Sequence, residues 1–315
     1  MGDMGLKAAV VGVGHLGRHH ARILSSVEGA TLIAVVDSSE PRAREIAAGV
    51  GARAYTDIRD LADDVDLVSI ATPTETHAEI AGYFLERGIP VLVEKPLART
   101  VGEADLIIGA AARSGAPLAV GHTERFNPAV AAARPLVKDP RFVEVHRLGT
   151  FPARSLDIDV VFDLMIHDLD LVLSIVGSEV VSIEALGVPV LTDRFDIANA
   201  RLRFASGCVA NITASRISRD RTRKIRFFQR DAYVSIDTGA REAEVYRLVR
   251  SPDRGAAIEG GRIPVPDREP LREELQDFVD AVRFGRAPLV GGADGRRAVA
   301  LAADITSQMA ANAAP

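Results

Sequence analysis

The stretch LKAAVVGVGHLGRHHARILSS, residues 6–26, combines a short apolar run with a turn through Gly12, Gly14 and Gly17. The apolar run predicts a strand of a parallel sheet that is covered on both faces, and the residues after Gly17 have the periodicity of a helix. Glycines at this spacing allow a tight turn and let a pyrophosphate approach the helix N-terminus, where free N–H groups favour anions. The stretch therefore predicts the first strand, turn and helix of a dinucleotide-binding fold.

A second apolar strand, TLIAVV, ends at Asp37, 20 residues after Gly17. At this position a dinucleotide-binding fold carries the carboxylate that binds the ribose hydroxyls of adenosine. A carboxylate repels the 2′-phosphate of NADP, so the sequence favours NAD as the cofactor. We expect further cofactor contacts from His15 and Leu16 in the glycine turn. The alternative is a glycine-rich turn in another kind of α/β protein.

Composition narrows the class of protein. A chain of 315 residues exceeds what one hydrophobic core usually supports, so two domains are expected. The 38 basic and 43 acidic residues give a net charge of −5, which argues against a nucleic-acid partner. Cys208 is the only cysteine, so we predict neither an intramolecular disulfide nor a cysteine-based zinc site. The sequence lacks a signal-peptide pattern and an apolar run of membrane length, which predicts a cytoplasmic protein that does not bind a membrane.

Strand and helix patterns alternate through residues 1–121, which predicts an N-terminal Rossmann domain on a parallel sheet. Ligands of such sheets bind beyond the carboxyl ends of the strands. Three polar loops fall there, at residues 71–74, 94–96 and 121–128. From the first two and the residues beside them we expect cofactor contacts by Thr72, Pro73, Thr74, His77, Glu94 and Lys95. Lys95 follows an apolar strand directly and precedes a proline, which restricts its backbone. The alternative is a surface lysine at a strand end, but its place beside the expected cofactor favours a function.

Residues 122–315 have a different pattern and predict a C-terminal α+β domain on an open, mainly antiparallel sheet. In DIANARLRFASGCVANITASR, residues 196–216, small and apolar residues alternate with others on both sides of the turn ASG. This alternation predicts a hairpin with one face on a hydrophobic core. The other face of such a sheet needs cover from helices or from a second subunit.

The segment VVFDLMIHDLDLVLSIVG, residues 160–177, predicts a largely apolar helix that carries several charges. At 100° per residue, one narrow polar stripe contains Asp159, Asp163, His167, Asp170 and Ser174. Asp168 points away from this stripe, so we expect it to have a structural role. Asp163 and His167 are four residues apart and can touch. They could be a structural pair, part of a solvent-facing stripe, two ligands of a metal site, or an acid and a histidine for general acid–base catalysis.

With the motifs GVGHLGRHHARIL, EKPL, GHTERFNP and DLMIHDLD in this order, the chain resembles the Gfo/Idh/MocA (glucose–fructose oxidoreductase / inositol dehydrogenase) family over essentially its whole length. The resemblance implies an NAD-dependent enzyme with a Rossmann domain, and a homodimer or homotetramer formed through the C-terminal sheet. It also implies that Lys95, Asp163 and His167 surround the hydroxyl group that is oxidised. Further substrate contacts are expected from Arg125, Asn127 and Arg154.

Within the family, GHTERFNPAV and DLMIHDLDL resemble enzymes that oxidise the 3-hydroxyl of UDP-N-acetylglucosamine for amino-sugar synthesis of the lipid A type. The expected mechanism has His167 remove the hydroxyl proton, Lys95 stabilise the developing alkoxide and Asp163 orient His167. One alternative is a dehydrogenase of a free polyol or sugar, such as inositol or glucose. The other is an NAD-binding regulator without catalytic activity.

Overall fold

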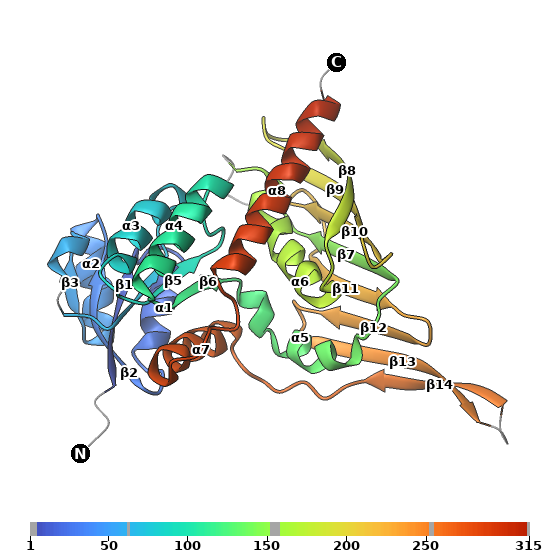
Figure 1. The fold of residues 1–315 in the computed structure, drawn as a ribbon, viewed down its shortest axis with the longest axis horizontal. Helices are drawn as coiled ribbons and strands as arrows, with labels where there is room; N and C mark the ends of the chain where they lie inside the picture. The colour runs from blue at the N-terminus through green and yellow to red at the C-terminus, as the bar shows by residue number, and fades with distance from the viewer. Residues whose placement is uncertain (1–4, 62–63, 152–157, 252–254, 314–315) are drawn as a thin grey trace. The chain divides into compact units, whose positions relative to one another are not determined.

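The computed structural model describes residues 5–61, 64–151, 158–251 and 255–313. The chain forms two compact units (Figure 1). Unit 1 consists of Met1–Thr123 and Glu269–Val299, and unit 2 consists of Glu124–Arg268 and Ala300–Pro315. No helix in these described ranges is both long enough and apolar enough to cross a membrane.

Unit 1 is built on a parallel sheet with the strand order β3-β2-β1-β4-β5-β6. Its strands are β1 (Leu6–Val11), β2 (Ala30–Val36), β3 (Arg53–Tyr55), β4 (Leu67–Ile70), β5 (Val91–Glu94) and β6 (Leu118–Gly121). The helices between them are α1 (Gly17–Leu24), α2 (Glu40–Val50), α3 (His77–Leu85) and α4 (Val101–Ser114). Strands β2 and β3 follow β1 on one side of the sheet, and β4, β5 and β6 follow on the other side. Such sheets bind dinucleotides at the point between β1 and β4 where the strand order changes side. This arrangement confirms the predicted Rossmann fold.

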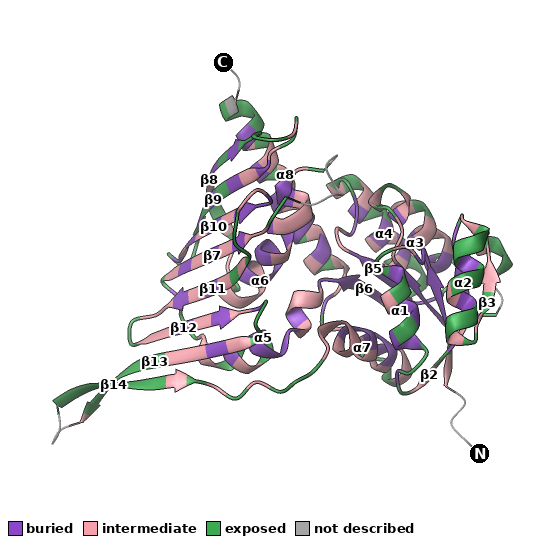
Figure 2. Ribbon diagram, turned by 180° about the vertical axis from the view of Figure 1, so that it is seen from behind, coloured by how far each residue is buried: buried purple, intermediate pink, exposed green. Residues whose placement is uncertain are grey.

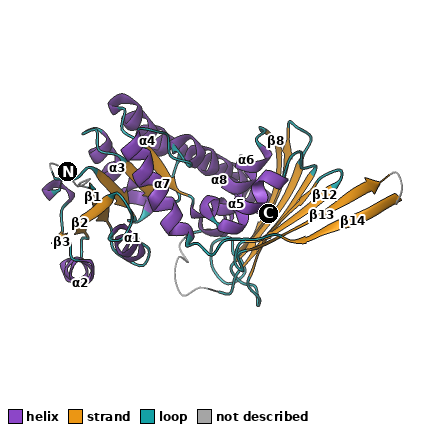
Figure 3. Cartoon of the chain, turned by 90° about the horizontal axis from the view of Figure 1, so that it is seen from below, coloured by secondary structure: helices purple, strands orange, loops and turns teal. Residues whose placement is uncertain are grey.

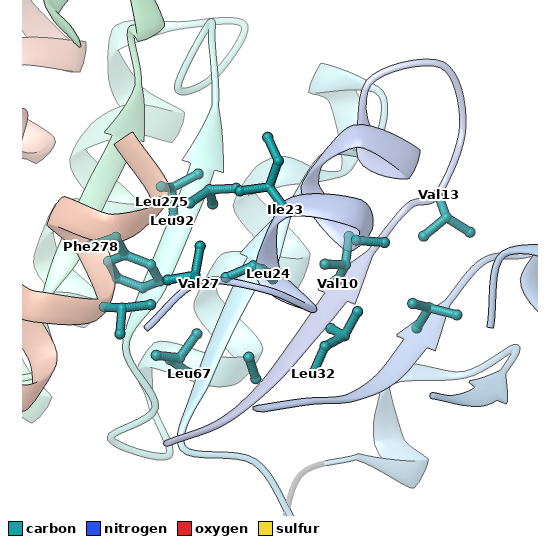
Figure 4. Close-up of a cluster of buried hydrophobic side chains, with 14 of the residues drawn as sticks. Val10, Val13, Ile23, Leu24, Val27, Leu32, Leu67, Leu92, Leu275 and Phe278 are labelled. Atoms are coloured by element: carbon teal, nitrogen blue, oxygen red, sulfur yellow. The ribbon is translucent and has the colours of Figure 1, made fainter. Parts of the chain in front are cut away.

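Helix α7 (Pro270–Phe284) belongs to unit 1, although it follows the second sheet in the sequence. Its buried residues Leu275, Phe278 and Val279 join the hydrophobic core around α1 and β1 (Figure 4). The division of the chain at residue 121 therefore needs a correction, because Glu269–Val299 returns to the first unit. The apolar positions of α7 lie three and four residues apart and require a hydrophobic partner, but their spacing does not say which unit supplies it.

Unit 2 contains a sheet with the strand order β14-β13-β12-β11-β7-β10-β9-β8. Its strands are β7 (Phe142–Leu148), β8 (Val180–Val188), β9 (Ile197–Phe204), β10 (Val209–Ser215), β11 (Thr222–Phe228), β12 (Ala232–Asp237), β13 (Glu242–Ser251) and β14 (Gly255–Arg262). Neighbouring strands are antiparallel except for β7 and β10, which are parallel. The open, mainly antiparallel sheet is thus confirmed.

The hairpin predicted for residues 196–216 is formed by β9 and β10. Residues on one face of each strand are buried, including Leu202 and Phe204 on β9 and Ile212 on β10. Helices α5 (Pro128–Ala133) and α6 (Ile166–Val176) lie on this face (Figure 3). Helix α8 (Gly292–Ala313) begins in unit 1 and continues into unit 2.

The opposite face of the sheet in unit 2 carries no helix among the described residues (Figure 3). Most residues of this face are half-buried or exposed, and in Figure 2 purple, pink and green residues occur along the same strands. The sequence predicted that either helices or a second subunit would cover the sheet. In the structure, helices cover one face only.

Candidate active site

The predicted cofactor residues of unit 1 share one edge of its sheet, because the carboxyl ends of parallel strands meet there. The ends of β1, β2, β4 and β5 carry Gly12, Gly14, His15, Leu16, Gly17, Asp37, Thr72, Pro73, Thr74, Glu94 and Lys95. His15 and Leu16 are exposed in the turn that leads into α1.

The three glycines between β1 and α1 differ in what surrounds them. Gly12 has a φ of +81°, and a Cβ built there would lie 2.7 Å from the side chain of Thr72. A Cβ on Gly17 would lie 1.7 Å from the carbonyl oxygen of Gly12, so the turn closes only with glycine at this position. Around Gly14, in contrast, no described atom lies within 4 Å of such a Cβ. This open space at the start of α1 fits the close approach of a dinucleotide pyrophosphate.

Asp37 at the end of β2 is held in place by the protein itself. Its carboxylate accepts hydrogen bonds from the N–H groups of Val13 (3.0 Å) and Ser39 (2.9 Å). Arg42, in the first turn of α2, donates two more, from Nε at 3.0 Å and from Nη2 at 2.6 Å. Burial favours the neutral acid, but these hydrogen bonds outweigh it and hold the pKa of Asp37 below its ordinary value. The position therefore carries a negative charge at neutral pH, as binding of ribose hydroxyls requires.

His77 was expected to contact the cofactor, but the structure gives its ring another role. The side chain is 1% exposed. Its Nδ1 and Nε2 each lie 3.0 Å from a backbone carbonyl oxygen, that of Pro96 and that of Thr72 respectively. Burial lowers the pKa of His77, although both carbonyls act in the opposite direction. The imidazole therefore lies between the loop after β4 and the loop after β5, and a neutral ring donates its single N–H group to one of the two carbonyls.

Glu94 and Lys95 stand at the end of β5. The side chain of Glu94 is buried, whereas Lys95 is half-buried and is followed by a cis peptide bond to Pro96. The Glu94 carboxylate is hydrogen-bonded within unit 1, to His20 on α1 among others. Sequence reasoning missed both His20 and Arg42, since their partners are identified only by the folded chain.

The helix of unit 2 that carries Asp163 and His167 does not begin as a regular α-helix. Residues Val161–Met165 form a π-helical turn, and α6 starts at Ile166. A π turn holds more residues than an α turn, so the uniform angle of 100° does not apply to the start of the segment. Asp163 and His167 are both half-buried, and π turns occur frequently at functional sites.

Other members of the predicted polar stripe have structural partners. Oδ1 of Asp159 accepts hydrogen bonds from the N–H groups of Val161 (3.0 Å) and Phe162 (3.3 Å), so it caps the start of the helix. Burial raises the pKa of Asp159, although these hydrogen bonds oppose the shift. Asp170 is 1% exposed and ion-paired with Arg125. The stripe is therefore not one continuous functional surface.

Asp168 has the structural role expected of it. Its carboxylate is buried and accepts two hydrogen bonds from Arg147, at 2.7 Å from Nε and at 2.9 Å from Nη2. Nη2 of Arg147 also donates to Glu124 at 3.0 Å. The resulting triad anchors α6 to β7, because Asp168 lies on the helix and Arg147 on the strand.

Two residues that were expected to contact the substrate make hydrogen bonds within unit 2. Arg125 is 8% exposed and donates to both oxygens of Asp170, at 2.6 and 3.0 Å. Asn127 is 3% exposed, caps α5 by accepting from the N–H group of Ala129 and donates to the carbonyl oxygen of Thr238. Both side chains are therefore buried and hydrogen-bonded within unit 2. Arg154, the third expected contact, lies outside the described residues.

Comparison with known proteins identifies both parts of the chain. Residues 6–122 match the model of the oxidoreductase family with an NAD-binding Rossmann fold, and residues 140–235 match the GFO/IDH/MocA C-terminal domain. The chain is 39% identical to UDP-N-acetylglucosamine 3-dehydrogenase of Acidithiobacillus ferrooxidans, with 95% of this chain and 96% of that protein covered. It is 30% identical to inositol 2-dehydrogenase of Rhizobium meliloti, with 95% of each covered.

Solved structures agree with this assignment. A crystal form of the Acidithiobacillus ferrooxidans UDP-N-acetylglucosamine 3-dehydrogenase superimposes with a TM-score of 0.91 at 38% identity and covers 98% of this chain and 99% of that one. Levoglucosan dehydrogenase in complex with NADH and levoglucosan shares the fold, with a TM-score of 0.88 at 21% identity and 98% of both chains covered. The predicted cofactor, NAD, and the predicted class, a dehydrogenase, are confirmed. The chain belongs to the Gfo/Idh/MocA family of NAD-dependent oxidoreductases.

Proposed function

We propose that this protein oxidises the 3-hydroxyl of UDP-N-acetylglucosamine to the 3-keto sugar, with NAD as the oxidant, and so supplies amino-sugar synthesis of the lipid A type. The observation that carries the proposal is the near full-length likeness to a UDP-N-acetylglucosamine 3-dehydrogenase at 39% identity. Because NAD and nucleotide sugars are cytoplasmic metabolites, the cytoplasm is the proposed location.

The side chains of each unit support this chemistry. NAD, when bound along Gly12, Gly14, Gly17 and Asp37, supplies the carbon that takes a hydride from the sugar. We assign His167 as the base that removes the hydroxyl proton, because imidazole titrates near neutral pH. Asp163 orients His167 from four residues upstream. Lys95, as an ammonium group, stabilises the negative charge that develops on the sugar oxygen.

A nucleotide-sugar substrate also needs cationic groups for its pyrophosphate. The turn between β10 and β11 carries two exposed arginines, Arg219 and Arg221, and a third, Arg223, is exposed near the start of β11. Arg216, at the start of the same segment, is different, since it is buried and its Nε donates to Asp196 at 2.8 Å. We propose the three exposed arginines as the pyrophosphate contacts.

The test is NADH formation with UDP-N-acetylglucosamine, measured beside myo-inositol and glucose. Oxidation of an alcohol by NAD is usually uphill at neutral pH, so the assay includes an aminotransferase or a carbonyl trap that removes the ketone. Turnover with the nucleotide sugar alone supports the proposal. Turnover with myo-inositol alone would contradict it and would support the second candidate function.

That second candidate, an inositol dehydrogenase, is favoured by the 30% identity to the inositol 2-dehydrogenase over 95% of both chains. A polyol has no pyrophosphate, so the two functions differ in their need for the exposed arginines. Replacement of Arg221 and Arg223 by alanine is expected to raise KM for a nucleotide sugar and to leave KM for myo-inositol unchanged. A lack of NADH formation with any sugar would instead indicate an NAD-binding regulator.

We further propose a homodimer or homotetramer in which the helix-free face of the sheet in unit 2 is the interface. A row of four aromatic rings, Phe142, Phe228, Tyr233 and Tyr246, crosses this face on four neighbouring strands. Their ring centroids are 5.6, 5.2 and 6.3 Å apart in that order. Leu186 and Val188 on β8 add exposed apolar surface, at 60% and 44% exposure. Apolar patches of this kind mark contact surfaces.

A further inference from the structure

A chain of buried hydrogen bonds links the helix after the glycine turn to the strand end that carries Lys95. His20 lies on α1 and is fully buried. Its Nδ1 is 2.8 Å from the hydroxyl oxygen of Ser69 on β4, and its Nε2 is 2.9 Å from Oε1 of Glu94 on β5. The other carboxylate oxygen of Glu94 accepts a hydrogen bond of 3.1 Å from the N–H group of Lys95. One carboxylate therefore joins His20 to the backbone of Lys95.

The Glu94 carboxylate is also enclosed by the neighbouring strand. A Cβ built on Gly121 of β6 would lie 3.0 Å from the Cα and 3.0 Å from the Cδ of Glu94, so the glycine backbone packs directly against the side chain. Glu94 itself is only 6% exposed. Removal of a donor from this site would leave a buried acceptor without its partner, which is costly compared with the same loss in water.

Glu94 is ionised at neutral pH in spite of its burial. Burial favours the neutral acid, but the hydrogen bond and charge of His20 and the charge of Lys95 outweigh it and hold the pKa of Glu94 below its ordinary value. Two further titratable groups face it, His77 from α3 and Glu274 from α7. Burial and the negative charge of Glu94 raise the pKa of Glu274 well above its ordinary value. The pKa values of the two carboxyl groups are therefore shifted in opposite directions.

Ser69 allows His20 to keep its hydrogen bond to Glu94 in either protonation state. With a neutral ring, the hydroxyl of Ser69 donates to Nδ1 and the Nε2–H group donates to Glu94. With a charged ring, both nitrogens donate, and the hydroxyl oxygen accepts. In both cases the carboxylate is held by His20 on one side and by the backbone of Lys95 on the other.

We propose that His20 and Glu94 are positioning residues for Lys95, which fix the end of β5 so that the ammonium group meets the substrate oxygen in the productive geometry. This inference rests on the proposed function, in which Lys95 stabilises the alkoxide. His20 acts only through Glu94 and the backbone of Lys95. A displacement of about 1 Å at a reacting group costs about a hundredfold in rate, so loss of the chain lowers kcat far more than it changes cofactor affinity.

The first test is the variant His20→Leu. Its kcat is expected to fall about 10- to 100-fold, while the Kd for NADH stays within about threefold of wild type because the glycine turn is intact. The chain has no tryptophan, so NADH fluorescence reports binding without overlap from that residue. His20→Gln, whose amide can donate to Glu94, is expected to recover part of the lost turnover. His19→Leu, the half-buried neighbour on the same helix, is the matched control and keeps wild-type kcat.

Wild-type kcat in folded His20→Leu overturns the inference. Where His20→Leu does not fold, Glu94→Gln decides in the same assay, because it preserves the shape of the side chain and removes its charge. Wild-type kcat in Glu94→Gln overturns the inference as well. A different result, wild-type turnover in Lys95→Ala, would contradict the proposed function.

A second readout needs no substrate. The chain has only four lysines, Lys7, Lys95, Lys138 and Lys224, so reductive methylation with an isotope label gives a resolvable set of NMR signals. In Glu94→Gln the Lys95 signal is expected to titrate at a lower pH than in wild type, because the adjacent negative charge is gone. The signal of Lys7 is the internal control. An unchanged Lys95 titration overturns the inference even where the sugar substrate proves to be different.

Discussion

Arg42 is ion-paired with Asp37 at the position that distinguishes NAD from NADP. The two side chains share hydrogen bonds of 2.6 and 3.0 Å, and Arg42 remains partly exposed while Asp37 is buried. An arginine is also a preferred ligand of phosphate. The preference for NAD is therefore set at the residue scale, by a carboxylate that both repels a 2′-phosphate and occupies the nearby guanidinium.

We expect Asp37→Ser to shift the cofactor preference toward NADP. The variant removes the repulsion and frees Arg42, so the ratio of kcat/KM for NADP to that for NAD should rise about 10- to 100-fold, the value of one charge-assisted hydrogen bond. Steady-state kinetics with both cofactors measure this ratio. In the double variant Asp37→Ser, Arg42→Ala the gain for NADP should disappear. A gain that survives the second substitution would contradict the role of Arg42.

The buried carboxyl group of Glu274 lowers the free energy of unfolding as the pH rises. Within the described ranges neither of its carboxyl oxygens makes a hydrogen bond of ordinary geometry, and Thr123 is the polar group that partly offsets its raised pKa. An acid whose pKa is raised in the folded state binds an extra proton there, so the free energy of unfolding falls as the pH rises from the unfolded pKa, near 4.5, toward the folded one.

Glu274→Gln is therefore expected to stabilise the protein by about 1–3 kcal/mol at pH 8, because an uncharged amide can be buried without the proton that the buried carboxyl group must take up. The gain should shrink toward zero below about pH 4, where the acid is protonated in both states. Urea denaturation at both pH values measures the difference, with Glu273→Gln as the control from the same helix. Destabilisation by Glu274→Gln at pH 8 would contradict the assignment.

The proposed catalytic roles of Lys95 and His167 can be tested by single substitutions. His167→Ala and Lys95→Ala should each lower kcat by at least about a hundredfold, as expected for a general base or a charge stabiliser. The Kd for NADH should stay near that of wild type, since the glycine turn and Asp37 are untouched. Fluorescence titration and coupled kinetics separate the two effects. Near-normal turnover in either variant would remove that residue from the mechanism.

At the element scale, the turn between β1 and α1 shows what the local sequence can predict. Three glycines predicted the turn, yet the structure distinguishes them. Gly12 has a positive φ and packs against Thr72, Gly17 packs against the carbonyl of Gly12, and Gly14 faces open space. The helix that carries His167 shows the opposite case. Its apolar pattern predicted a helix, but the π turn at Val161–Met165 and the cap from Asp159 changed the faces assigned by a uniform angle.

The glycine turn yields a paired prediction. Gly14→Ala should fold with a melting temperature close to that of wild type, because nothing in the described structure lies within 4 Å of the added Cβ. It should still weaken NADH binding about tenfold or more, since the methyl group occupies the space of the pyrophosphate. Gly17→Ala should instead destabilise the fold, because its Cβ would meet the Gly12 carbonyl at 1.7 Å. Calorimetry and NADH titration of both variants check this, and unchanged NADH affinity in Gly14→Ala would contradict the placement of the pyrophosphate.

At the scale of the whole molecule, the helix-free face of the sheet in unit 2 is the surface that we propose binds a second copy. In the aromatic row, Phe142, Phe228 and Tyr233 are half-buried, and Tyr246 is 38% exposed. Burial of such a row in a second copy would contribute through the apolar area removed from water. The proposed assembly therefore depends on this face of the sheet.

Tyr233→Arg should reduce the mass measured by size-exclusion chromatography with light scattering. The substitution places a charge in the middle of the aromatic row, which disfavours burial of that face against a second copy. Tyr83→Arg, a half-buried tyrosine on α3 of unit 1, is the control and should leave the mass unchanged. A wild-type mass in Tyr233→Arg would show that another surface forms the assembly.

The sequence by itself determined the two types of sheet, the dinucleotide-binding turn, the position of Asp37 and the buried face of the β9–β10 hairpin. All of these depend on periodicity or on spacing between near neighbours. Only the tertiary structure decided that α7 returns to unit 1, that Asp170 pairs with Arg125 across 45 positions, and that His20 pairs with Glu94 across 74. Buried charges are stabilised by the particular groups they meet in the folded chain. Periodicity states which residues are buried, but it does not state which distant residue becomes the partner.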